Sequence, residues 1–116
     1  MNLLICQYLA NLFLEMKTAG QIIKEKRESK NMLLRHVAAI LDIDQAILSR
    51  IERGERRPSR DNITKLAKAL DINEIDLLIQ FMSDKIAAEI INEDCPSKAL
   101  EIAMEKIKYL KEHLNK

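Results

Sequence analysis

Four side chains between positions 45 and 50 have the types and the spacing needed to hydrogen-bond to DNA bases. Gln45, Ala46, Ser49 and Arg50 recur three and four residues apart, so they share one face of a helix. A glutamine amide pairs with the adenine edge, and an arginine pairs with guanine O6 and N7, in the major groove. Ser49 is short enough to bond a base or to allow a close approach. We therefore predict that these four residues contact bases.

Arginines cluster directly after this face. Five of them lie within residues 50–60, which is more than solubility requires. Arg53, Arg56, Arg57 and Arg60 are predicted to contact phosphates, which position a protein on DNA without specifying its sequence. The basic excess is confined to this part of the chain, because residues 17–70 hold 13 Lys or Arg and 7 Asp or Glu, whereas the rest of the chain is acidic. We expect double-stranded DNA to be the partner of this part alone.

The elements that must position these residues are two short helices joined by a tight turn. Apolar residues three and four apart mark the first helix around residues 34–41, and the second is predicted over residues 45–53. Ala38 is small where the first helix must approach the second. We expect the carboxylate of Asp44 to cap the second helix and Gly54 to end it in a left-handed conformation. This arrangement is a helix-turn-helix, a motif that is moderately specific on its own.

The composition and the remaining periodic segments predict an all-α protein. The chain has 116 residues with two Gly, two Pro and 3% aromatic residues, which is too few turn and aromatic residues for a sheet protein. Ser59 is expected to cap one further helix and Asn73 another. The additional helices are predicted over residues 22–31, 59–70, 73–92 and 96–114.

Three parts follow from these boundaries: an apolar extension over residues 1–16, a DNA-binding domain over residues 17–78, and a helical C-terminal extension over residues 79–116. The first part is too short to span a bilayer and lacks the basic region of a signal peptide. Two interpretations of it remain open. Translation naturally starts at Met16, or the stretch is a short helix that packs on the domain or on a second subunit.

Enzyme chemistry is not predicted. His36 and His113 are isolated, and the chain has neither a glycine-rich phosphate loop nor a nucleophile motif. We expect no cofactor, no metal, no small-molecule ligand and no membrane. Cys6 and Cys95 lie far apart without metal-ligand spacing, which fits two ordinary thiols in a reducing cytoplasm.

One combined string resembles a known family. It consists of Ser-Arg-Ile-Glu-Arg-Gly at 49–54, Arg-Pro-Ser at 57–59 and Leu-Ala-Lys-Ala-Leu at 66–70. It is similar to the phage-repressor-like helix-turn-helix regulators, the Cro/C1-type or xenobiotic-response-element family, over about residues 19–78. The resemblance implies a five-helix repressor-like bundle with Gln45–Arg53 as recognition helix, and dimeric binding to palindromic operators. It also implies a structural role for Glu52.

The chain departs from that family at two positions. Leu33 and Leu34 stand where the family has Ser or Thr followed by Gln, so Arg35 or His36 is expected to supply the phosphate contact of that helix. Asp42 stands in place of the usual glycine of the turn. Arg35 therefore joins the predicted phosphate contacts.

The C-terminal extension carries an a/d seam over two heptads, made of Leu100, Ala103, Ile107, Leu110 and Leu114. We predict that this seam dimerises the protein. In the outcome we favour, the seam also folds back onto apolar residues of the preceding helix, namely Phe81, Met82, Ile86 and Ile90, and the remaining apolar face of this hairpin pairs with the second subunit. The alternative is a purely intramolecular hairpin.

The predicted function is a sequence-specific transcriptional regulator, a repressor or an activator, acting as a homodimer. The rival hypothesis is an antitoxin or bridging protein-interaction module built on the same fold.

Overall fold

The computed structural model describes residues 16–114, which form six α-helices and no strand. The predicted extension over residues 1–16 lies, apart from Met16, outside the described residues. The all-α prediction is confirmed, and no helix within residues 16–114 is long and apolar enough to cross a bilayer. The helices are α2 (Ala19–Ser29), α3 (Leu34–Leu41), α4 (Gln45–Glu52), α5 (Arg60–Leu70), α6 (Glu74–Ile90) and α7 (Pro96–Leu114).

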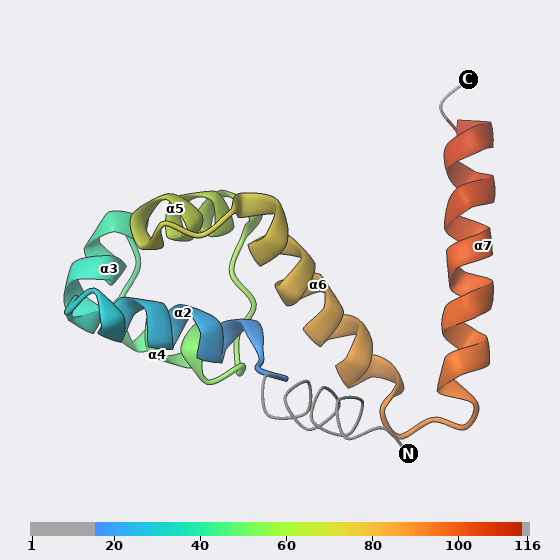
Figure 1. Ribbon diagram of the computed structural model, residues 1–116, viewed down its shortest axis with the longest axis horizontal. Helices are drawn as coiled ribbons and strands as arrows, with labels where there is room; N and C mark the ends of the chain where they lie inside the picture. Colours follow the sequence, from blue (N-terminus) through green and yellow to red (C-terminus); the bar gives the residue numbers. More distant parts are fainter. Residues whose placement is uncertain (1–15, 115–116) are drawn as a thin grey trace, which may run out of the picture. The chain divides into compact units, whose positions relative to one another are not determined.

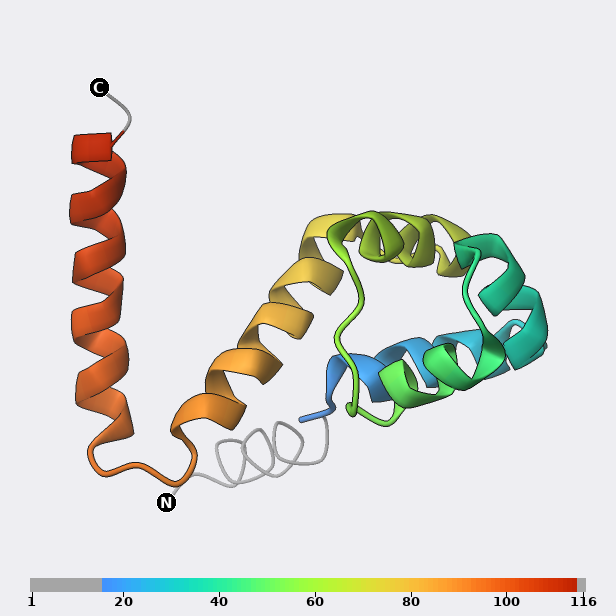
Figure 2. The same cartoon turned by 180° about the vertical axis from the view of Figure 1, so that it is seen from behind.

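The chain divides into two compact units, one ending at Asp84 and one beginning at Lys85. In the first unit, α2 packs on α4 and α5, and α3 packs on the same two helices. Figures 1 and 2 show α2 and α4 running side by side, with α5 on the other side of the core.

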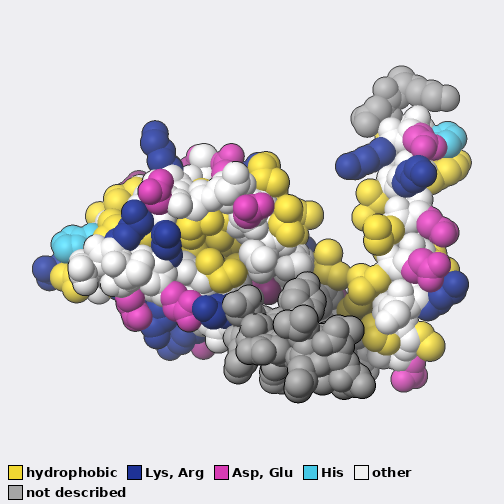
Figure 3. All heavy atoms as spheres, in the orientation of Figure 1, with side chains coloured by type: hydrophobic (Ala, Val, Ile, Leu, Met, Phe, Trp, Pro, Cys, Tyr) yellow, Lys and Arg dark blue, Asp and Glu magenta, His cyan; other side chains and the backbone are white. Residues whose placement is uncertain are grey.

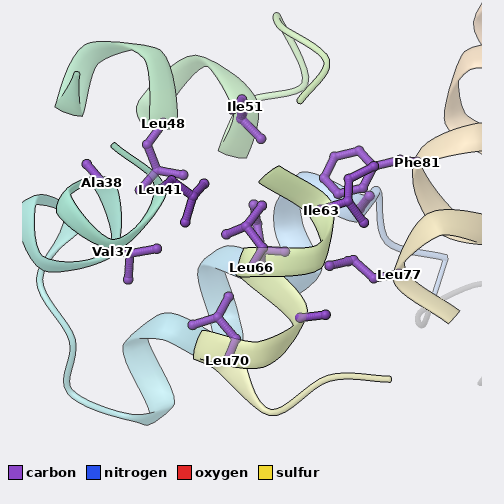
Figure 4. Packing of buried hydrophobic residues seen from close by; sticks show 13 residues of the cluster. Val37, Ala38, Leu41, Leu48, Ile51, Ile63, Leu66, Leu70, Leu77 and Phe81 are labelled. Atoms are coloured by element: carbon purple, nitrogen blue, oxygen red, sulfur yellow. The ribbon is translucent and has the colours of Figure 1, made fainter. Parts of the chain in front are cut away.

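The core forms because each helix buries one apolar stripe. On α5 the stripe is Ile63, Leu66, Ala67 and Leu70, at the three- and four-residue spacing of a helix face, and each is at most 4% exposed. Full burial of a side chain such as Leu66 stabilises the fold by about 1.5–3 kcal/mol. Figure 4 shows side chains of α3, α4, α5 and α6 meeting in this cluster. The buried residues of the other helices are Ala19, Ile23, Val37, Ala38, Leu41, Leu48, Ile51, Leu77 and Phe81.

The helix starts are capped largely as predicted. Ser59 Oγ accepts the Asn62 amide at 3.1 Å, and Asn73 Oδ1 accepts the Asp76 amide at 3.0 Å. The prediction for Asp44 was wrong, because its side chain makes no capping hydrogen bond. Asp44 occupies the cap position with extended backbone, and its carboxylate is exposed to solvent.

Left-handed residues follow α2, α3, α4 and α5, and the one after α2 is Asn31, with a φ of 56°. Asp42 after α3 and Asp71 after α5 have φ angles of 56° and 60°, and Gly54 after α4 has a φ of 77°. Aspartate tolerates this conformation because its short polar side chain bonds locally. Asp42 therefore replaces the glycine that the family uses, and the turn between α3 and α4 stays tight.

Within the second unit, α7 is 19 residues long and has no buried residue. Figure 3 shows hydrophobic side chains along it at the surface, among charged ones.

Candidate nucleic-acid interface

The helix-turn-helix consists of α3, the turn at residues 42–44, and α4. Ala38 of α3 is 3% exposed, and α3 packs against α4. Leu48 and Ile51 of α4 are 0% and 1% exposed and point into the core (Figure 4). One side of α4 is therefore held by the core, and its opposite side faces solvent.

The four predicted base contacts lie on the solvent side of α4. Gln45, Ala46 and Arg50 are exposed, and Ser49 is half-buried. Because α4 has helical geometry, residues 45 and 49 are neighbours one turn apart, as are residues 46 and 50. The structure thus brings a glutamine amide, a serine hydroxyl and a guanidinium together on one face, where each can donate to an acceptor on a base edge.

The five predicted phosphate contacts are all exposed. Arg53 is the C-terminal cap of α4, Arg56 and Arg57 lie in the loop after it, Arg60 is the first residue of α5, and Arg35 lies in the first turn of α3. Arg53 forms an exposed ion pair with Glu55, with 3.3 Å between Nη2 and Oε2. The other four arginines pair with no carboxylate in the described part of the chain.

A buried ion pair anchors the end of α4. Arg27 of α2 donates from Nε to Glu52 Oε2 at 2.7 Å and from Nη2 to Glu52 Oε1 at 3.0 Å. Its Nη1 donates to the Met32 carbonyl at 3.0 Å. The side chain of Arg27 is 12% exposed and that of Glu52 is 6% exposed, so the two parallel hydrogen bonds of this fork are shielded from water.

This pair has an electrostatic and a structural consequence. The hydrogen bond to Glu52 raises the pKa of Arg27 above its ordinary value; desolvation opposes the shift, and the charges of Glu52 and Glu28 add to it. The guanidinium therefore stays charged, and α4 is tied to α2. Glu52 is structural, as the family resemblance implied. Local sequence patterns did not point to Arg27, because its partner lies 25 residues away.

Two further contacts hold the helices around α4. An ideal Cβ on Gly20 would lie 2.4 Å from the Glu52 carbonyl oxygen and 2.6 Å from that of Ile51, so α2 approaches the α4 backbone at a glycine. Asp84 Oδ2 accepts the Ala19 amide at 2.7 Å, which fastens α6 to the start of α2. Neither contact was predicted, because each joins residues far apart in the sequence.

The first helical turns of α6 carry an apolar stripe that the core does not cover. Ile75, Ile79 and Met82 are 54%, 53% and 44% exposed. Their spacing of four and three residues places them on one face, away from the buried Leu77 and Phe81. The same spacing was visible in the sequence, but neither Ile75 nor Ile79 was predicted to lie on an exposed face.

Comparison with known proteins assigns the class of protein. A family model described as Helix-turn-helix matches residues 23–77. The chain is 43% identical over 60 residues to the control protein C.BamHI of Bacillus amyloliquefaciens, covering 51% of this chain and 74% of that protein. The chain therefore belongs to the helix-turn-helix family of DNA-binding transcriptional regulators, of the Cro/C1 type.

Other relatives carry similar descriptions. The HTH-type transcriptional regulator MT0491 of Mycobacterium tuberculosis is 35% identical over 54 residues, covering 47% of this chain and 39% of that protein. The solved structure of the restriction-modification controller protein C.AhdI from Aeromonas hydrophila is 37% identical and covers 51% of this chain and 89% of that chain, with a TM-score of 0.47. The solved structure of the clp gene regulator ClgR from Corynebacterium glutamicum is 24% identical. The match covers 82% of this chain and 89% of that chain, with a TM-score of 0.49.

Proposed function

We propose that this regulator binds palindromic operators as a homodimer and reads base sequence with α4. The observation that carries the proposal is the two-sided character of α4. Leu48, Ile51 and Glu52 fix it to the core, while its solvent side carries an amide, a hydroxyl and a guanidinium. A rigid helix with exposed polar groups is what readout in the major groove requires.

The proposed roles divide by chemistry. Gln45 presents an amide donor and an amide acceptor suited to adenine N7 and N6, Arg50 presents two donors suited to guanine O6 and N7, and Ser49 and Ala46 allow the helix to lie close to the bases. The five exposed arginines at positions 35, 53, 56, 57 and 60 contact phosphates and set the register on the duplex. A pure protein-interaction module would not need these arginines together, which is why we favour the regulator over the antitoxin or bridging hypothesis.

We also propose which genes this regulator controls. C.BamHI, which is 43% identical over 60 residues, is named as a control protein. We propose a comparable role in controlling neighbouring genes, exercised in the cytoplasm where the DNA is accessible.

A second copy is needed because one short helix contacts only a few base pairs. Two copies about 34 Å apart, one turn of DNA, read both halves of a palindrome. We propose that the α7 seam of Leu100, Ala103, Ile107, Leu110 and Leu114 joins them. The α6 stripe belongs to a helix already anchored by buried side chains, whereas α7 has none buried.

Selection from random duplexes tests the DNA-binding proposal. The full chain is incubated with a random DNA library at fixed salt, and bound duplexes are sequenced. We expect enrichment of an inverted repeat with half-sites about one helical turn apart. A doubly substituted control, Gln45→Ala with Arg50→Ala, keeps the core and should enrich no sequence. If the folded unsubstituted chain also enriches none, sequence-specific binding is wrong.

Sedimentation of two full-length variants tests the dimer. Ile107→Asp alters the α7 seam, and Ile79→Asp alters the α6 stripe at a similarly exposed isoleucine, 54% against 53%. We expect Ile107→Asp to sediment as a monomer and Ile79→Asp to remain dimeric at micromolar concentration. The opposite pattern would assign the dimer to α6 instead.

A further inference from the structure

Helix α7 has the length and surface of a helix that requires a partner. All its described residues are exposed, including Leu100 at 40%, Ile107 at 54% and Leu110 at 48%. In proteins, most of the stability of a helix comes from packing its apolar face rather than from helix propensity. Its seam residues fall on one arc of the helix because they are spaced three and four residues apart.

The residues flanking the seam are basic in its second half. Lys106 and Lys111 lie at the g and e positions beside Ile107 and Leu110, and no carboxylate occupies a flanking position of this seam. A parallel pair of α7 helices in register would place Lys106 opposite Lys111 of the second copy, and the symmetry would repeat that repulsion on the other side.

An antiparallel pair changes these contacts. When the two helices overlap over their full length, Leu100 lies opposite Leu110 of the second copy, and Lys111 lies near Ser97. The two like-charge contacts become one, between the two copies of Lys106 near the symmetry axis. The charge distribution along the whole of α7 agrees with this direction, since residues 96–105 hold one lysine and two glutamates, and residues 106–114, with Lys106 and Lys111 included, hold three lysines and one glutamate.

Side-chain volume favours the same direction. In a parallel pair, Ala103 meets Ala103 and leaves the layer underfilled, while Ile107 meets Ile107. In the antiparallel pair, each Ala103 lies opposite an Ile107, so a small residue faces a large one in both central layers. Alternating small and large residues fill an interface without voids.

We infer that α7 pairs antiparallel with α7 of a second copy of this chain, with layers Leu100–Leu110 and Ala103–Ile107 each occurring twice. This inference rests on the proposed homodimer and specifies its direction. The opposite side of α7 stays outside the pair. Tyr109 lies there and stacks on His113, which flanks the seam at the g position beside Leu114, with 4.0 Å between ring centroids.

Disulfide trapping distinguishes the two directions. The full chain carries Cys6→Ser and Cys95→Ser, and then either Leu100→Cys or Leu110→Cys, one of the two bearing a tag that changes its mass. In the antiparallel pair, residue 100 and its copy are about 15 Å apart along the axis, because ten residues separate the two layers. That distance is too long for a disulfide, whereas residue 100 and residue 110 of the second copy are in contact.

We expect no linked dimer from either variant alone, and a linked dimer containing about half of the chains in an equal mixture, as random pairing dictates. Linked dimers from each variant alone would show a parallel pair. No linked dimer in any sample would show that α7 is covered by its own chain or by another protein. Circular dichroism checks the folding of both variants. Gel shifts with the reduced proteins report DNA binding independently, so failure of the proposed function is recognised separately.

Discussion

Replacing Gly20 with alanine tests how closely α2 must approach the recognition helix. The added methyl group would meet the Glu52 carbonyl oxygen at 2.4 Å, the Ile51 carbonyl oxygen at 2.6 Å and the Glu52 carbonyl carbon at 2.8 Å. All three are backbone atoms, so no side-chain rotation can relieve the overlap. The two helices must move apart by about 1 Å to reach ordinary carbon–oxygen contact.

Two opposing effects determine how much Gly20→Ala changes the free energy of unfolding. Alanine is favoured over glycine in a helix by about 1 kcal/mol. Forcing a methyl group into a packed interface costs about 1–3 kcal/mol, occasionally more. Because the obstacle is backbone, we take the upper end of that range and expect a net loss of about 2 kcal/mol in the free energy of unfolding.

Urea unfolding followed by circular dichroism measures this loss. We expect the midpoint to fall by about 1–2 M. Gly54→Ala is the matched control, since Gly54 has a φ of 77° with nothing within 4 Å of an added Cβ. Its cost is conformational only, about 1 kcal/mol. A Gly20→Ala variant as stable as the natural chain would refute the close approach.

Three further substitutions test other parts of the interface. Glu52→Ala removes both carboxylate acceptors of the shielded Arg27 fork and leaves only the exposed Glu28 carboxylate 4.0 Å away, so unfolding should become easier by about 3 kcal/mol, and Arg27→Met with Glu52→Leu should recover most of this in urea titrations. A double variant no better than Glu52→Ala would argue against the ion pair as the cause. Ser59→Ala removes the cap of α5 and should cost about 1 kcal/mol by thermal unfolding, with an unchanged melting temperature contradicting it. Arg56→Ala with Arg57→Ala should weaken binding to every sequence and lower the salt slope by about 0.9 per lost phosphate contact, and an unchanged slope would remove both from the phosphate-binding set.

Local patterns predicted the elements of this fold well. The stripe from Ile63 to Leu70, the cap at Ser59 and the left-handed stop at Gly54 each depend on a few adjacent residues. Their physics is local, so spacing and residue type suffice. The predicted capping hydrogen bond of Asp44 was wrong, because residue type alone does not determine whether a carboxylate accepts from the amides of the first turn or remains in solvent.

Long-range contacts were not accessible in the same way. The partner of Arg27 lies 25 residues away, and the partner of the Ala19 amide lies 65 residues away. Nothing in the local pattern specifies which charged residues meet across the core. The exposure of Ile75 and Ile79 could not be predicted for a related reason. An apolar helix face is expected to lie in the core, and only the packing of the other helices shows which face of α6 they cover.

The central claim is that α4 reads bases while the surrounding arginines hold phosphates. Its most direct test is the affinity of Arg50→Ala for a complete set of single-base variants of the selected operator, beside Arg57→Ala on the same set. We predict that Arg50→Ala loses about 1–3 kcal/mol on the selected operator and no longer discriminates at one base-pair position in each half-site. We predict that Arg57→Ala loses affinity equally on every sequence. An equal loss on every sequence for Arg50→Ala would contradict base readout by α4.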